Sequence, residues 1–123
     1  MGKPVTAQTL EDVLAELDDD ERSRIEDLGD AIQVALLEPL TFQQSKLDGQ
    51  RTVEELRLPK KVKGKHLKKL DSVKGEVTQS LALMAALAGV PAHALDELDA
   101  RDLELMTTVM GPFLPKSRKT GLD

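Results

Sequence analysis

The stretch IQVALLEPLTF, residues 32–42, decides the fold class, because apolar residues occupy every second position at its start. This is the spacing of a β-strand, and we expect Pro39 to end the strand or to place it at a sheet edge. The turn pair Asp48-Gly49 follows, and a second alternating stretch covers residues 52–58. The pattern predicts an antiparallel β-hairpin, which is marginal alone and must pack on helices or on another chain.

Two apolar helices are predicted after the hairpin. The second half of residues 76–88 is apolar on all sides, which indicates a helix buried in its own core or in a partner. Gly89 fits the left-handed position that ends such a helix. Asp99 fits the N-cap of the next helix, with Asp102 placed to complete a capping box. Apolar residues then recur every three to four positions over residues 103–113, which is helical spacing.

A helical segment is also predicted before the hairpin. Residues 10–28 indicate one bent helix or two short ones, with Thr9 and Asp12 as a capping box and Gly29 as the stop. We therefore expect a small α+β protein, mostly helical, with an N-terminal helical segment, one antiparallel β-hairpin and a C-terminal helical cluster. Its expected parts are an acidic helical extension (1–30), a single α+β domain (31–114) and a flexible tail (115–123).

Composition limits the classes of protein that remain. The chain has 123 residues, which fits one domain, and it has no cysteine. Disulfides, thiol catalysis and cysteine-ligated metals are therefore excluded. The longest nearly apolar run, residues 81–92, is shorter than the roughly 20 residues that a membrane-spanning helix needs. The N-terminus lacks the apolar stretch of a signal peptide, so we expect no contact with a membrane.

Charge is segregated along the chain. Residues 1–38 hold three basic and eleven acidic residues, a net charge of −8, whereas residues 57–74 hold eight basic and one acidic residue, a net charge of +7. The basic stretch is expected to contain a short helix bounded by Gly64 and Gly75. Opposite charges of this size attract each other within one chain or between neighbouring molecules, or they form two solvated faces that salt screens.

No catalytic motif is present. His66 lies among lysines, which disfavour its protonated form, and His93 follows a proline in an expected surface turn. No serine lies in a nucleophile-elbow motif, and no phosphate-binding loop is found. We therefore expect no enzyme activity, no metal and no cofactor. Nucleic-acid binding through residues 57–74 is the main rival on charge, but this stretch lacks the aromatic side chains on which bases stack.

Three stretches of sequence carry a resemblance to a known family. They are VALLEP (34–39), TVEELRLPK (52–60), and LALMAALAGVPAHALDELDARDLELM (81–106) with GPFL at 111–114. In this order they resemble the tail assembly chaperones of P2-like and Mu-like bacteriophages and prophages. The resemblance implies a non-enzymatic, ATP-independent chaperone that works in the host cytoplasm and is absent from the mature virion. Its implied partners are the tape measure protein, a long helical rod, and the tail tube protein.

A helical chaperone of this kind covers apolar partner helices by packing them in a groove. We expect apolar contacts from the two C-terminal helices and electrostatic steering of an acidic partner by the basic stretch, although ordinary core filling also explains the apolar residues. The residues expected to bind the partner are Leu83, Leu87, Met106, Met110, Lys60, Lys61, Lys65 and Lys68. A homo-oligomer is left open, and the alternative function is a nucleic-acid-binding or regulatory phage protein that uses residues 57–74.

Overall fold

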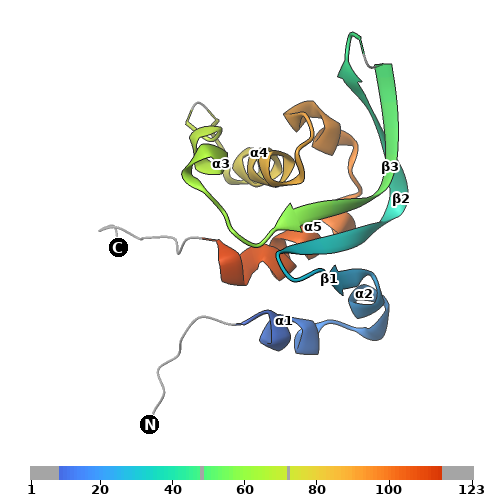
Figure 1. Cartoon of the computed structure of the whole chain (residues 1–123), viewed down its shortest axis with the longest axis vertical. Helices are drawn as coiled ribbons and strands as arrows, with labels where there is room; N and C mark the ends of the chain where they lie inside the picture. Colours follow the sequence, from blue (N-terminus) through green and yellow to red (C-terminus); the bar gives the residue numbers. More distant parts are fainter. Residues whose placement is uncertain (1–8, 48, 72, 115–123) are drawn as a thin grey trace.

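The fold comes from a computed structural model that describes residues 9–47, 49–71 and 73–114, and it combines one sheet with several helices (Figure 1). The strands form a single antiparallel sheet in the order β1-β2-β3. The elements in chain order are α1 (Leu10–Glu16), α2 (Asp19–Ser23), β1 (Ile25–Asp27), β2 (Ala31–Ser45), β3 (Gly49–Pro59), α3 (Gly64–Lys68), α4 (Glu76–Ala88), the 3-10 helix η1 (Ala92–Glu97), α5 (Ala100–Met110) and the 3-10 helix η2 (Gly111–Phe113). The predicted α+β class is confirmed, whereas the expectation of a mostly helical chain is not, because 48% of the described residues are helical.

Strands β2 and β3 form the predicted hairpin, and both are longer than expected. The pairing is interrupted between Ala35 and Leu40, and Pro39 lies within this interruption, so β2 continues past the proline instead of ending there. Proline cannot donate to the ladder and is tolerated at such a bulge, which also bends the strand. Figure 1 shows the hairpin bending sharply, with its distal part standing beside η1.

A third strand corrects the prediction of a single hairpin. Ile25, expected on the apolar side of a helix, starts β1 and pairs with Val34 of β2. The chain reverses through Gly29, which has a φ of 94°, and the N–H of Leu28 donates to the carbonyl of Ala31. A glycine adopts this left-handed conformation without steric cost, so the predicted helix stop is instead part of a strand-to-strand turn.

The core lies between the sheet and the helices. Helix α4 and η1 pack on the inner side of the bent hairpin, and α1 packs against α5 (Figure 1). Ile32, Val34 and Leu58 of the sheet are fully buried, and Val13 of α1 is 2% exposed. The acidic N-terminal segment therefore packs on the rest of the fold through α1 and β1. The predicted flexible tail, residues 115–123, lies outside the described residues.

Local capping chemistry was predicted well. The capping box of Thr9 and Asp12 is confirmed, and so is Gly89 in the left-handed conformation after α4, with φ 75° and ψ 29°. The side chain of Asp99 caps α5 by accepting a hydrogen bond from the N–H of Arg101 at 2.8 Å. Asp102 takes no part in this cap, and its carboxylate binds a different part of the chain, as described below.

Candidate partner-binding surfaces

The four apolar residues predicted to contact a partner lie in the core. Leu83 and Leu87 of α4 are 8% and 5% exposed, and Met106 and Met110 of α5 are 0% exposed. A partner reaches such side chains only if the helices separate. The predicted contact residues therefore lie on the buried faces of α4 and α5, and a surface on the folded monomer must use other residues.

The outward faces of the same two helices form a groove. Its volume is about 230 Å³, and the side chain of Val77 beside it is 68% exposed. The groove is lined by apolar and small side chains with a single acid, namely Val77, Ser80, Ala100, Leu103, Glu104, Thr107 and Thr108. Small side chains allow another helix to approach closely, because they leave the groove between the two backbones open. In the sequence, Val77 and Ser80 are three residues apart and Leu103 and Thr107 are four apart, a spacing that places each pair on one face of its helix.

The basic stretch, residues 57–74, contains one lysine that forms an ion pair and several exposed lysines that form none with the described residues. Lys60 is 22% exposed, its Nζ lies 2.8 Å from Oδ1 of Asp27, and it sits 5.9 Å from the centre of the Phe113 ring. The hydrogen bond from Lys60 lowers the pKa of Asp27. Lys60, which was predicted to steer a partner, thus joins the end of β3 to β1 through this ion pair. Lys61 and Lys65 remain exposed. Lys68 is exposed as well, and steering of a partner by these three residues stays a prediction.

His66 is held neutral by its surroundings. Its Nδ1 accepts a hydrogen bond from the N–H of Lys63 at 2.9 Å, which requires an unprotonated nitrogen. Partial burial lowers the pKa of His66, and the neighbouring charges of Lys65, Lys63 and Lys69 lower it further. The predicted direction is confirmed, and the histidine is a local cap of α3.

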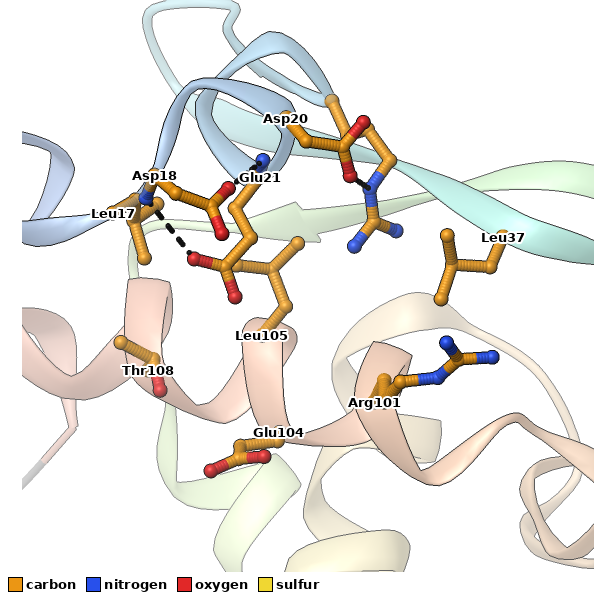
Figure 2. A pocket seen from close by; sticks show the side chains of 10 residues that line it. Leu17, Asp18, Asp20, Glu21, Leu37, Arg101, Glu104, Leu105 and Thr108 are labelled. Carbon is orange, nitrogen blue, oxygen red and sulfur yellow. Dashed lines mark hydrogen bonds and ion pairs between the residues drawn. The ribbon is translucent and has the colours of Figure 1, made fainter.

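An acidic cleft lies between α2 and α5 (Figure 2). It has a volume of about 310 Å³, and leucines from three elements form its apolar part, namely Leu17, Leu37 and Leu105. Figure 2 shows the carboxylates of α2 on one side and Leu105, Thr108 and Arg101 of α5 on the other. The acidic residues that line it are Asp18, Asp20, Glu21 and Glu104. Nothing in the sequence analysis placed the acids of α2 beside α5.

A buried ion pair lies next to this cleft. Nη1 of Arg24 donates to Oδ1 of Asp102 at 2.7 Å, and the N–H of Leu37 donates to Oδ2 of Asp102 at 2.9 Å. The side chain of Asp102 is 0% exposed and that of Arg24 is 13% exposed. Nη1 of Arg24 also donates to the carbonyl of Ala35 at 3.0 Å. The pair therefore ties the N-terminal segment, the middle of β2 and helix α5 together.

The described ranges contain neither a membrane-spanning helix nor a metal-binding cluster. Among these residues, no helix is long and apolar enough to cross a membrane. No group of three or more histidines and acids in residues 9–47, 49–71 and 73–114 is arranged to hold a metal ion. The features that remain are surfaces: a groove between two helices, an acidic cleft and a row of exposed lysines.

The fold and these surfaces define a small α+β protein with a short groove between two helices and strongly separated charges. A family model described as phage tail assembly chaperone proteins, E, or 41 or 14, matches residues 34–115, which is well over half of the chain. The chain therefore belongs to the family of phage tail assembly chaperones, as the resemblance in its sequence indicated. No match was found among curated proteins or among solved structures.

Proposed function

We propose that this protein assists tail assembly by holding an apolar helix of the tape measure protein in the groove between α4 and α5. Membership of the tail assembly chaperone family supports the role in tail assembly. The single observation that supports the site is Val77, which is 68% exposed beside a groove formed by two packed helices. The tail tube protein is a second candidate partner. Action in the host cytoplasm and absence from the mature virion belong to the same proposal.

The groove has the chemistry that helix-in-groove recognition uses. Val77 and Leu103 supply apolar surface on its two sides, and Ser80 and Ala100 are small enough to let a partner helix pack closely. The groove is short, so the area buried is small and the contact is reversible. Reversible binding suits a chaperone, because the tape measure protein must leave it when tail tube subunits close around the rod.

The exposed lysines of the basic stretch favour a partner helix that carries negative charge. Helix α3 packs against α4, and residues 60–74 lead directly into the N-terminal end of α4, where Val77 lies. Positive charge beside an apolar groove attracts a partner helix with an acidic flank and speeds its encounter. We therefore propose that Lys65 and Lys68 act mainly on the association rate and its salt dependence, whereas Val77 acts on the lifetime of the complex.

Co-expression with the tape measure protein tests the groove. Val77→Asp adds a charge to the groove at an exposed position, so the fold is expected to survive while the soluble fraction of the tape measure protein falls. Leu47→Asp is the matched control, because Leu47 is 96% exposed and lies near the hairpin tip, outside the groove. Thermal melting of both variants checks the fold. Equal soluble fractions with the two folded variants would refute the groove as the binding site.

Nucleic-acid binding stays a second candidate because lysines around α3 are exposed. A gel-shift titration distinguishes it, since binding to phosphates weakens steeply as salt rises and is lost in Lys65→Glu with Lys68→Glu. Binding to DNA together with no effect on the tape measure protein would favour this candidate.

A further inference from the structure

We propose that copies of this chain associate head to tail, with the exposed lysines around α3 of one copy docking in the acidic cleft between α2 and α5 of the next. The partner is thus a second copy of the same chain. The inference shares Lys65, Lys68 and Glu104 with the surfaces of the proposed function, but its test is separate because it needs no other protein.

The cleft carries negative charge that the monomer does not neutralise. Four of its residues are carboxylates: Asp18, Asp20, Glu21 and Glu104. Its two arginines are already engaged, since Arg24 pairs with buried Asp102 and Arg101 pairs with Asp99 at 2.9 Å. Oδ2 of Asp20 lies 3.9 Å from Nε of Arg24, which is the outer limit of an ion pair. Asp18 and Glu21 each accept a hydrogen bond from a backbone N–H of the α2 capping box, at 2.8 and 3.2 Å. A cation that enters the cleft therefore meets four carboxylates whose charge is only partly compensated.

The shape of the cleft suits a lysine better than a small ion. A lysine side chain has an apolar stem and a charged head, and it binds best where apolar surface lies below a polar rim. Leu17 and Leu105 supply such surface, and Leu37 of β2 is 37% exposed beside them. In Figure 2 the side chains of Asp18 and Asp20 lie above Leu105. The cleft thus offers a surface to the stem and carboxylates to the ammonium group.

The lysines that would fill it form no ion pair with a described acid of their own copy. Among the described residues, only Lys60 of the basic stretch forms an ion pair, with Asp27. The exposed lysines of the stretch are Lys61, Lys63, Lys65, Lys68, Lys69 and Lys74. The positive surface of the monomer is therefore as uncompensated as the negative cleft.

The two charged surfaces lie on opposite sides of the molecule. Figure 1 shows α3 beside α4 above the sheet and α2 below it, with β2 and β3 passing between them. The lysines of α3 therefore do not fill the cleft of their own copy. Joining two different surfaces gives a heterologous contact, which repeats from copy to copy and produces an open chain or a closed ring.

Sedimentation velocity over a range of protein concentrations tests this association. In about 0.1 M salt we expect species larger than the monomer that grow with concentration. In about 1 M salt, where the screening length falls from about 10 Å to about 3 Å, we expect the monomer. A monomer at every concentration in low salt would overturn the proposal, and so would association that is unchanged in high salt.

Charge reversal then identifies the surfaces. One variant carries Lys65→Glu with Lys68→Glu, and the other carries Asp20→Lys with Glu104→Lys. Each variant alone is expected to be monomeric, because the substituted positions then carry the same sign as the surface that they would meet. An equimolar mixture is expected to associate again, because each surface of one variant faces an opposite charge on the other. Folded variants that associate alone, or a mixture that stays monomeric, would overturn the assignment.

Neutral substitutions keep the test decisive if a reversed variant fails to fold. Lys65→Gln with Lys68→Gln removes two charges without introducing repulsion, and Asp20→Asn with Glu104→Gln does the same in the cleft. Losing two exposed charge contacts is expected to weaken association roughly tenfold. Unchanged association in both neutral variants would refute the role of these surfaces.

Discussion

Replacing Asp102 with alanine should destabilise this fold more than any change of a surface charge. The substitution removes the carboxylate that Arg24 and the N–H of Leu37 share, at 2.7 and 2.9 Å. It leaves a cation that is 13% exposed with only the distant carboxylate of Asp20, 3.9 Å from its Nε, and it leaves a backbone donor without its acceptor. Both groups were desolvated on folding, and neither recovers its hydration in the variant.

The size of the effect follows from this burial. Removing one partner of a buried ion pair costs about 3–5 kcal/mol, because an uncompensated charge stays behind. The whole free energy of unfolding of a domain is about 5–15 kcal/mol. Asp102→Ala is therefore expected to remove about a fifth or more of the stability of the protein.

Urea unfolding followed by circular dichroism measures this cost. The midpoint should fall while the slope of the transition stays the same. An unchanged slope means that the surface exposed on unfolding is unchanged, so the shift reports stability alone. Arg101→Ala is the control, because its side chain is 73% exposed and an ion pair so exposed to solvent contributes little to stability. The double variant Arg24→Ala with Asp102→Ala should cost less than the sum of the two single variants. A cost for Asp102→Ala as small as that of Arg101→Ala would refute the account of this pair.

Three further predictions concern local features of the fold. Gly89→Ala should cost about 1 kcal/mol in urea unfolding, because φ is 75° there, whereas Gly111→Ala, at φ −46° in open space, should be neutral or slightly stabilising. His66 should titrate below about 6.5 by NMR, and its contribution to stability should be present above that pH and be lost as the pH falls toward its lowered pKa. Hydrogen bonds from Arg101 lower the pKa of Asp99 from 3.8 to about 2, so the stabilisation from Asp99 should be full above pH 3.8 and be lost as the pH falls to about 2. In Arg101→Ala the NMR midpoint of Asp99 should move up toward its usual value.

Elements marked by local chemistry were predictable from the sequence. The bounds of α4 and the left-handed Gly89 follow from a run of helix-forming residues that ends in glycine. The N-caps at Thr9 and Asp99 also depend only on nearby residues. Strand β1 carries no such mark, since Ile25 lies at helical spacing from its neighbours and becomes a strand only because β2 offers an edge to pair with.

The surfaces were harder to predict than the elements, because burial depends on packing between distant segments. Helix α4 is apolar on all sides in its second half, so its pattern does not show which face meets the sheet. Leu87, predicted to contact a partner, is therefore found in the core. Asp102 sits where a capping box requires an acid, and only the position of Arg24 beside α5 assigns it to the ion pair. Val77 was passed over because it is a single apolar residue in the polar half of α4.

The ion pair of Arg24 and Asp102 also orders events during synthesis. The two residues are separated by 78 positions in the chain. At translation rates of about 5–20 residues per second, Asp102 is therefore synthesised roughly 4–16 seconds after Arg24. The amino-terminal helices therefore cannot dock in their final place until helix α5 has been made.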